Sequence, residues 1–571
     1  MNLDRRTLIV LLIIIAAGLG LRTWGIRFGH PDVGYVDAGA TVRPPQRIAY
    51  NILNKKFDLD PQYYLYPTFF TNLLAAEYVI YGLFYALSHD SPAGFTEKID
   101  ALFKDEKNFH KFELIARINS AITGTLTIFF VFLLGMVASN NDKRIGLIAA
   151  LFLAFMYLHV KDSHYPMTDA TMALFSTIAL IYIVKVFLEG TLKNFLYAGL
   201  FTGIATGVKY LPITLGLPFA CALFFRWNNE RKMTHLSTTF YTQIGAAFLL
   251  FCLGFLITTP MFIPKFNSFT ERMLRTYRGK AITAEEKQAG VKGKLGQTQQ
   301  NYFDYLFSTT PNWNEPLCIN SLMGAMDLPL LILTLMALIY GIWHGITHGV
   351  MKGSDEGIIN IIFAIYCIVY YLILAKPKGG RAVRYFYLFL PLYCVIASDF
   401  LTKAVDLCVH SKKYKNTVLF ILALIFVAPT GIRSFRYSRL MSHVDTRILA
   451  REWIEKNIPK KSRILMSGLY SPNLSSSMYD LMTYSKPMIR KRILTYDLIV
   501  NNKIHYVLLS SYLYDRYFHR ETLEEYPEVA ATFKKLYDTL EGKATLLHVI
   551  ENNVKNRPGP TIRIYKINYF P

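Results

Sequence analysis

Repeated apolar stretches of about 20 residues, the length of a helix that spans a bilayer, constrain this chain more than any other feature. Two examples are LIVLLIIIAAGLGL (8–21) and FLLFCLGFLI (248–257). Of the 571 residues, 52% are hydrophobic, and the mean hydropathy is +0.26. That composition is too apolar for a soluble protein of this size. The sequence therefore predicts a polytopic α-helical membrane protein.

The net charge of +22 does not indicate nucleic-acid binding. Lys and Arg lie mainly in short loops between apolar stretches and in the C-terminal tail, where they orient helices and meet anionic lipid headgroups. The six cysteines show no pairing pattern and no CxxC motif, so neither a disulfide framework nor a zinc site is predicted.

The distribution of positive charge predicts the topology. The stretch at 67–87 is ambiguous, because it could span the membrane or lie in its interface. If it does not span, the basic loops all fall on one side of the membrane. The positive-inside rule therefore places it in the interface or makes it re-entrant. We then expect about 11 spans with the N-terminus in the cytoplasm and the first apolar segment kept as an anchor. The expected spans lie near 8–26, 114–138, 144–160, 168–188, 194–209, 211–226, 238–259, 328–346, 357–375, 384–402 and 416–432.

Two domains are expected. A membrane domain over 1–437 carries large external loops at 27–113 and 260–327 and a short one at 161–167. From 438 to 571 the hydropathy drops, which predicts an external α/β domain. DTRILAREWIEKNIP (445–459) is typical of an amphipathic helix, and RILMSG, HYVLLSS, ATLLHVIE and TIRIYKI are typical of short strands.

The first external loop carries carboxylates and arginines directly after the first span. Asp32 and Asp37 precede Pro44-Pro45, and Arg43 and Arg47 lie one turn apart on the helix that these prolines would start. Either Asp alternatively caps that helix.

The short external loop HVKDSHYPMTDATM (159–172) adds His164 and Asp169. An N-cap or first-turn role for Asp169 and a purely structural role for His164 are the alternatives. Neither HxxxH nor DxD spacing occurs in this loop, so no metal site is predicted.

Basic residues gather on the outer side, against the positive-inside trend. AKPKGGRAVRYFYLFLP (375–391) places Lys376, Lys378, Arg381 and Arg384 at an outer boundary, and Lys209 lies between two apolar stretches. An anionic headgroup or phosphate explains such cations, although snorkelling towards ordinary phospholipid is an alternative. Carboxylates beside a phosphate-binding rim suit a lipid-linked phosphosugar, because an Asp can take the proton of an acceptor hydroxyl.

These residues lie in a series of short motifs. They are GYVDAG with LYP (65–67), SHYPMTDATMALF (163–175), GIATGVKYLP (203–212), TTPMFIPKF (258–266), RYFYLFLP (384–391), DTRILAREWIEKNIP and GPTIRIYKI (559–567). In their order and spacing the chain resembles the dolichyl-phosphate-mannose protein mannosyltransferase-like group of GT-C glycosyltransferases, which includes the aminoarabinose transferase of lipid A.

The resemblance implies a GT-C fold and an enzyme that transfers a sugar from a polyprenyl-phosphate carrier with inversion at the anomeric carbon. It also implies an outer-face reaction without a metal or other cofactor. The candidate base is Asp37, with Asp32 as a rival; the Glu that follows it in the family is Ala38 here, which puts the activity in question. Asp169 matches a second external carboxylate, and Lys209, Arg384 and Tyr385 match positions near the carrier phosphate.

The partners implied are the polyprenyl-phosphate-linked sugar, membrane lipids and an acceptor that is a protein, lipid or glycan. The expected location is a bacterial inner membrane with the site facing the periplasm. Two other functions stay open. One is an inactive carrier-binding relative, which Ala38 favours; the other is a secondary transporter, although the sequence shows no repeated halves.

Overall fold

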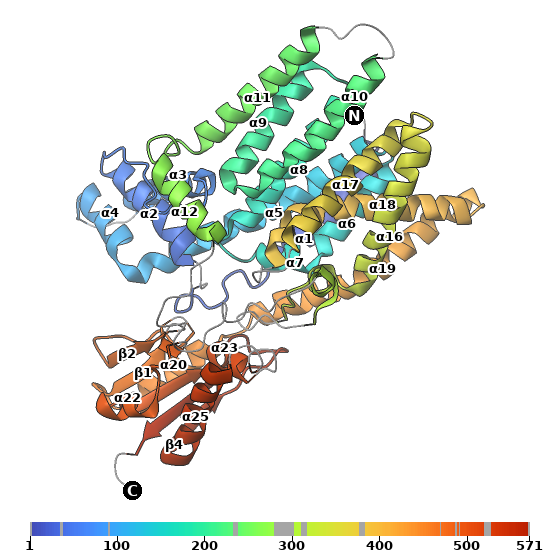
Figure 1. The fold of residues 1–571 in the computed structure, drawn as a ribbon. Coiled ribbons are helices and arrows are strands. Elements are labelled where there is room, and N and C mark those ends of the chain that lie inside the picture. Colours follow the sequence, from blue (N-terminus) through green and yellow to red (C-terminus); the bar gives the residue numbers. More distant parts are fainter. Residues whose placement is uncertain are drawn as a thin grey trace.

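A bundle of long helices and a small sheet domain make up the structure (Figure 1). This computed structural model describes residues 3–34, 38–88, 92–231, 238–278, 302–309, 317–375, 383–468, 470–485, 488–489, 491–518, 523 and 527–568. The helices of the membrane part are α1 (Arg5–Thr23), α2 (Ala38–Leu53), α3 (Phe69–Ser88), α4 (Phe95–Lys104), α5 (Phe109–Ala138), α6 (Lys143–Phe155), α7 (Tyr157–Asp162), α8 (Thr168–Leu188), α9 (Leu192–Val208), α10 (Gly216–Arg231), α11 (Thr238–Thr258), α12 (Phe266–Arg278), α14 (Tyr302–Phe307), α15 (Leu322–Met326), α16 (Leu328–His344), α17 (Asp355–Leu374), α18 (Leu390–Cys408) and α19 (Lys412–Met441). Short helical turns are η1 (Glu106–Asn108), η2 (Leu211–Leu215), η3 (Gly345–Val350) and η4 (Val383–Phe389).

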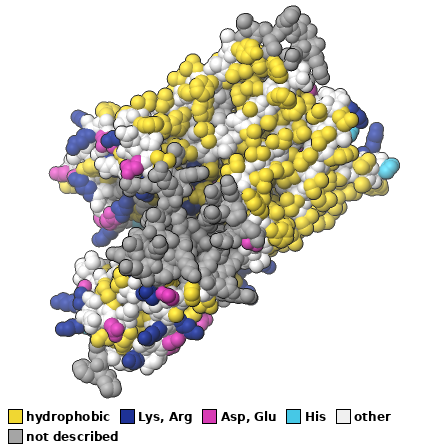
Figure 2. All heavy atoms as spheres, viewed as in Figure 1, with side chains coloured by type: hydrophobic (Ala, Val, Ile, Leu, Met, Phe, Trp, Pro, Cys, Tyr) yellow, Lys and Arg dark blue, Asp and Glu magenta, His cyan; other side chains and the backbone are white. Residues whose placement is uncertain are grey.

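The helical bundle confirms the expected fold class of an integral membrane protein. In the described part of the chain, 9 helices are long and apolar enough to cross a bilayer. Side chains on the visible face of the bundle are mostly hydrophobic, whereas charged side chains gather around α2–α4 and on the C-terminal domain (Figure 2). The helices α6, α9 and α10, which we expected to span, have only 13, 17 and 16 residues, so the count of about 11 spans stays a prediction.

The stretch expected to span over 144–160 is divided in the structure. It forms α6 and α7, which meet at Met156. The buried guanidinium of Arg22 donates hydrogen bonds to the carbonyls of Leu153 (3.2 Å) and Ala154 (3.0 Å). These carbonyls lie in the last turn of α6, where helical partners run out, and that of Leu153 also accepts the backbone N–H of Met156 (3.4 Å). A cation from α1 therefore satisfies the backbone groups that the interruption exposes.

Helix α3 lies against one end of the bundle, here called the domain end because it faces the C-terminal domain (Figure 1). Near its start, Asn72 donates to the carbonyl of Thr258 at the end of α11 (3.2 Å). Further along, Tyr78 donates to the carbonyl of Phe112 in the first turn of α5 (2.9 Å). Both contacts lie at the domain end. Helix α3 is one of the nine helices of the described chain that are long and apolar enough to span, so the in-plane placement of 67–87 stays a prediction.

Helices α9 and α11 approach each other closely along a stripe of glycines. A Cβ atom added to Gly199, Gly203 or Gly207 would lie 2.0, 2.2 or 2.0 Å from Ala247 O, Phe251 O or Thr258 Oγ1, respectively. Small residues at four-residue spacing permit such close packing in membranes. The packing fixes the end of α9, where Lys209 follows.

The C-terminal domain is a five-stranded sheet with helices on both faces. Its elements are α20 (Thr446–Asn457), β1 (Arg463–Ser467), β2 (Asp480–Tyr484), α22 (Tyr496–Asn501), β3 (Tyr506–Ser510), α23 (Ser511–Tyr514), η5 (Asp515–Tyr517), α25 (Pro527–Lys543), β4 (Ala544–Ile550) and β5 (Ile562–Ile567). The strand order is β2-β1-β3-β5-β4, with β1 parallel to β2 and β3, and β5 antiparallel to β3 and β4.

Alternation of side chains along the strands supplies two apolar layers. Ile464 packs with Ala450 and Ile454 of α20, whereas Leu465 packs on the other face with Phe533 of α25. The predicted helix at 445–459 and the four predicted strands correspond to α20, β1, β3, β4 and β5. Strand β2 (DLMTY) was not predicted; it lies at a sheet edge and is partly exposed, so it lacks the run of apolar residues that marks a buried strand.

Gly203→Val is expected to destabilise the membrane domain by about 1–3 kcal/mol, because the added side chain overpacks the contact with the backbone of α11. Thermal unfolding of the purified protein in detergent would show a lower Tm. Gly245→Ala on α11 is the matched control, since an added Cβ at that position meets no atom within 4 Å. An unchanged Tm for Gly203→Val would contradict this account of the α9–α11 contact.

Candidate functional site

A buried ion pair lies at the domain end of the bundle. Asp169 is in the first turn of α8, and Lys209 directly follows α9. Their Oδ1 and Nζ atoms are 2.8 Å apart, and the side chains are 1% and 4% exposed, respectively. The N-cap of α8 is Met167, which makes no side-chain cap hydrogen bond. Asp169 is therefore not the N-cap but a first-turn acid of α8, as one of the structural alternatives expected, and it is also the partner of a buried lysine.

Two aromatic rings enclose the ammonium group. The Nζ atom of Lys209 lies 5.6 Å from the ring centroid of Tyr66 and 5.3 Å from that of Tyr385, within the range of a cation–π contact. The charge of Arg384 acts on both Tyr66 and Lys209. These five residues (Tyr66, Asp169, Lys209, Arg384 and Tyr385) are here called the Asp169–Lys209 cluster.

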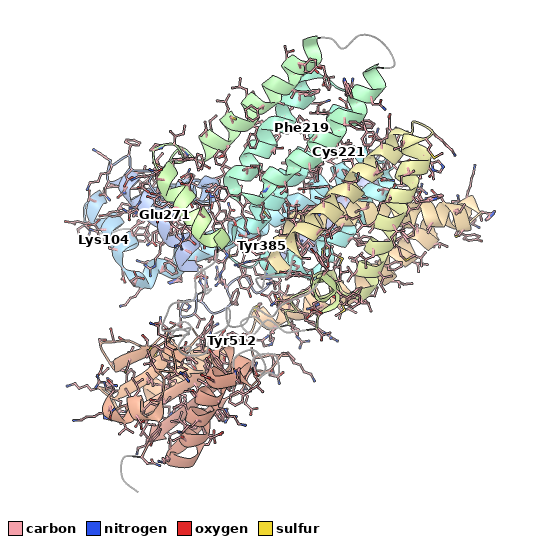
Figure 3. The ribbon with its side chains drawn as sticks, viewed as in Figure 1. Lys104, Phe219, Cys221, Glu271, Tyr385 and Tyr512 are labelled. Atoms are coloured by element: carbon pink, nitrogen blue, oxygen red, sulfur yellow. The ribbon has the colours of Figure 1, made fainter. Side chains whose placement is uncertain are left out.

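The Tyr66 phenol of the cluster stays in its neutral form. Burial raises the pKa of Tyr66, and the nearby positive charges of Lys209 and Arg384 oppose that rise without cancelling it. A neutral phenol offers an O–H donor to a ligand oxygen. Tyr385 lies where the helical bundle meets the region facing the C-terminal domain (Figure 3).

Buried oxygens beside the cluster lack hydrogen-bond partners. They are Asp169 Oδ2 and Thr259 Oγ1, and both residues are almost fully buried. Buried polar atoms in proteins nearly always have a partner, and exceptions often mark functional sites. An ionised carboxylate oxygen can accept hydrogen bonds but cannot donate them. Asp169 Oδ2 therefore suits a ligand hydroxyl that donates a hydrogen bond.

The arginines of the first external loop have different environments. Arg43 is exposed and donates to both carboxylate oxygens of Glu106 (2.8 and 2.9 Å), which joins α2 to η1. Arg47 is partly buried, and its Nε and Nη2 atoms have no hydrogen-bond partner. The charge of Arg47 acts on Tyr64, two residues before Tyr66. Arg47 is therefore better placed than Arg43 to meet an anion.

Tyr64 also links the first loop to the segment after α11. Its hydroxyl donates to Asp60 (2.8 Å), and Asp60 pairs with Lys265 (3.1 Å). Burial, followed by the Asp60 hydrogen bond, raises the pKa of Tyr64 to about 12. Lys265 is thus taken up by a carboxylate, whereas Arg47 keeps unpartnered guanidinium nitrogens.

Four of the predicted residues lie outside the described part of the chain: Asp37, Lys376, Lys378 and Arg381. The segment that leads to Asp37 is nevertheless well fixed. Buried Arg117 of α5 donates to the carbonyls of Ile26 (3.0 Å) and Phe28 (2.9 Å) and pairs with buried Glu113 (2.6 Å). A buried cation on α5 therefore holds the loop that precedes the candidate base.

His164 and Asp32 do not join the Asp169–Lys209 cluster in the described contacts. The ring nitrogens of buried His164 lie 2.9 and 3.0 Å from the carbonyl oxygens of Val160 and Trp24, and burial lowers its pKa to about 4. This environment matches the structural alternative for His164. Asp32 forms an ion pair with Arg451 of α20.

Sequence reasoning did not identify Tyr66 or Arg117. Tyr66 lies in LYP, one of the motifs that carry the resemblance, so the motif marked the segment but not the side chain. Arg117 lies inside ELIARINSAITG, where a cation in an apolar stretch is a functional or structural signal in itself. The structure adds the partners that explain it.

Lys209→Met is expected to destabilise the protein by about 3–5 kcal/mol, because Asp169 then remains buried as an uncompensated charge. The double variant Asp169→Leu/Lys209→Met should regain most of that stability, since no charge is left buried. Thermal and denaturant unfolding in detergent would measure both. A double variant as unstable as Lys209→Met would show that the unpaired charge of Asp169 is not the cause of the lost stability.

Comparison with known proteins gives one family match. The family described as dolichyl-phosphate-mannose-protein mannosyltransferase matches residues 107–257. This range begins just before α5 and ends within α11, so it includes Asp169 and Lys209. No curated protein matches the sequence.

Solved structures share the fold. The Archaeoglobus fulgidus oligosaccharyltransferase tethered with an acceptor peptide is 14% identical, with 92% of this chain and 72% of that chain covered and a TM-score of 0.51. The archaeal oligosaccharyltransferase AglB from Archaeoglobus fulgidus, in complex with an inhibitory peptide and a dolichol-phosphate, gives the same identity and coverage with a TM-score of 0.50. ArnT from Cupriavidus metallidurans in the apo state is 11% identical over 97% of each chain, with a TM-score of 0.48. The family match and the oligosaccharyltransferase fold together confirm the resemblance to the protein mannosyltransferase-like group of GT-C glycosyltransferases.

Proposed function

We propose that this protein is a membrane glycosyltransferase that moves a sugar from a polyprenyl-phosphate carrier to an acceptor hydroxyl. The observation that carries the proposal is the Asp169–Lys209 cluster, in which a buried carboxylate oxygen without a partner lies beside cations and a phenol. A carboxylate oxygen that can accept a hydrogen bond from a hydroxyl group, next to groups that can bind phosphate, suits a sugar phosphate. The oligosaccharyltransferase with a related fold has been solved with a dolichol-phosphate.

The phosphate of the carrier would lie against the cationic side of the site. Arg384 and the Tyr66 phenol belong to the cluster, and Arg47 offers guanidinium nitrogens without partners. Lys376, Lys378 and Arg381 extend this positive rim in the sequence. Lys209 contributes less, because Asp169 already neutralises it. Arginine suits this role, since its planar fork binds two phosphate oxygens at once.

Transfer proceeds by a single displacement. Asp37 takes the proton of the acceptor hydroxyl while that oxygen attacks the anomeric carbon from the face opposite the phosphate. The bond between the anomeric carbon and the phosphate oxygen breaks, and polyprenyl phosphate leaves with the electron pair. The cations stabilise the charge that develops on the leaving group. One displacement inverts the configuration of the sugar.

Asp169 orients the sugar in this scheme. Its Oδ1 atom is held by Lys209, which fixes the carboxylate so that Oδ2 can accept a hydrogen bond from a sugar hydroxyl. We propose that the reaction needs no metal. In the residues that the structure describes, His, Cys, Asp and Glu side chains form no group of three or more suited to an ion.

We further propose that the site faces the periplasm of a bacterium whose inner membrane holds the protein. The positive-inside pattern of the basic loops supports this orientation. Domain-end residues then lie outside, where a polyprenyl-linked sugar and an acceptor protein, lipid or glycan meet.

A second candidate function is carrier binding without catalysis. The observation that favours it is Ala38, the first residue of α2, which is 1% exposed. It stands where the family has the Glu that follows the candidate base. Direct comparison of carrier binding with turnover separates the two functions.

Asp37→Asn is expected to lower turnover by about 10²–10⁴-fold, the usual contribution of a general base, while the carrier still binds. The measurement is release of free polyprenyl phosphate by reconstituted protein, given a panel of polyprenyl-phosphate sugars and membrane extract as the acceptor source. Asp58→Asn is the matched control, since Asp58 is an exposed carboxylate of the same external loop.

Turnover by Asp37→Asn at the wild-type rate would remove Asp37 from the chemistry. Carrier binding by the wild type without any release would favour the carrier-binding function.

A further inference from the structure

The C-terminal domain makes direct polar contact with the segment that leads to Asp37. Asp32 of that segment pairs with Arg451 of α20, and the two side chains are 17% and 23% exposed. A guanidinium–carboxylate pair that is largely shielded from water holds its partners in a defined geometry. The segment and the helix belong to different domains, so this pair joins them.

The base of the same segment is fixed to α19. Ser438 donates to the carbonyl of Leu21 (2.7 Å), and the rings of Trp24 and Phe435 are 5.1 Å apart. Gly25 has a φ of 83°, and a Cβ added there would lie 2.7 Å from Ser438 O. Any other residue would be strained and would clash at this position. The start of the loop and the end of α19 therefore form one rigid unit.

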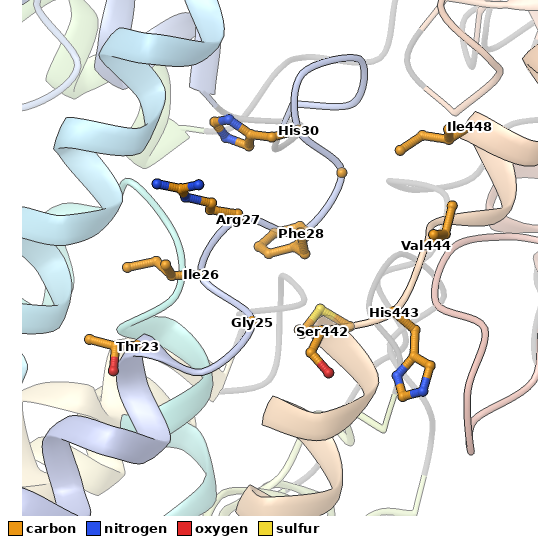
Figure 4. A pocket seen from close by; sticks show the side chains of 12 residues that line it. Thr23, Gly25, Ile26, Arg27, Phe28, His30, Ser442, His443, Val444 and Ile448 are labelled. Carbon is orange, nitrogen blue, oxygen red and sulfur yellow. The ribbon is translucent and has the colours of Figure 1, made fainter.

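Beyond this base, the loop and the C-terminal domain separate. A cleft of 440 Å³ opens between residues 23–30 and 441–448, lined by Phe28 on one side and by Ser442, Val444 and Ile448 on the other (Figure 4). Side-chain packing does not fill this space. The Asp32–Arg451 pair therefore fixes the far part of the loop across a cleft.

The opposite side of the loop rests on the bundle. Arg117 holds the carbonyls of Ile26 and Phe28, and Glu113 Oε2 lies 2.8 Å from the place where a Cβ of Gly34 would stand. Residues 26–34 are thus held by α5 on one side and by α20 on the other, and they are the last described residues before Asp37.

We infer that Arg451 is a positioning residue for sugar transfer. It acts through Asp32, whose carboxylate it holds, and so sets the position of residues 26–34, which precede Asp37 in the chain. The C-terminal domain is by this contact a working part of the catalytic site, and Asp32 is a structural partner and not the general base. The inference rests on the proposed function, because it assigns Arg451 a role in the same reaction.

The test is a charge-exchange series in the full-length, reconstituted protein. Arg451→Asp and Asp32→Arg are each expected to lower the turnover number by about 10- to 100-fold, the scale of a displacement of roughly 1 Å at a reacting group. Carrier binding, measured with polyprenyl phosphate alone, should stay unchanged. The double variant Asp32→Arg/Arg451→Asp restores the opposite charges and should recover much of the turnover.

Arg492→Asp is the matched control. Arg492 forms an ion pair with Glu528 (2.9 Å) inside the C-terminal domain that is more exposed than the Asp32–Arg451 pair. This variant should turn over like the wild type. Single variants at Asp32 and Arg451 with wild-type turnover would overturn the inference, as would a double variant no better than the singles.

A second readout does not depend on turnover. Amide hydrogen exchange at residues 26–34 should quicken in Arg451→Asp and return in the double variant, while exchange in β1 and β3 stays slow. If the wild type shows no turnover, the proposed function fails but faster exchange in the loop still shows the coupling. Unchanged exchange in the loop would overturn the coupling by itself.

Discussion

The buried ion pair between Asp169 and Lys209 is the interaction on which the candidate site depends. An unpaired charge at this depth would cost several kcal/mol, so both residues must be present and in contact. Each follows from a helix boundary, since α8 begins one residue before Asp169 and α9 ends one residue before Lys209. The positions of these helices are in turn set by close packing, above all along the glycine stripe of α9. A change in helix packing far from the site is therefore transmitted to the carboxylate that faces a ligand.

Buried arginines perform a related task in the connections. Arg22 and Arg117 are fully buried. Arg22 donates to the carbonyls of Leu153 and Ala154 in the last turn of α6, and Arg117 donates to those of Ile26 and Phe28 in the loop after α1. In a low-dielectric environment such carbonyls need partners, and a guanidinium supplies several at once. Hydrogen bonds from buried arginines in this way hold the backbone after α1 and at the end of α6.

The sequence predicted much of the fold, because apolar length and alternation are strong signals. The long helices and four of the five strands were found, and the exceptions have physical reasons. The predicted span over 144–160 is interrupted at Met156, next to carbonyls that accept hydrogen bonds from Arg22, and β2 is an edge strand that is partly exposed. The site was predicted less well. Asp169 and Lys209 were chosen separately, and nothing in their spacing indicated a contact between them. Tyr66 and Arg117 gain their roles only from the tertiary arrangement, as does the pairing of Asp32 with Arg451.

The position of β5 in the sheet has a consequence for assembly. It is the last strand in sequence, yet it lies between β3 and β4 and pairs with both. The turn before it also holds the start of α20, because Thr446 bonds to the carbonyls of Pro558 and Pro560 (2.9 and 2.6 Å). During synthesis the sheet cannot close until β5 has emerged, long after the membrane helices have been made. The sheet of this domain is therefore completed only after the preceding membrane helices, and chains truncated before β5 would enter the membrane without a finished sheet.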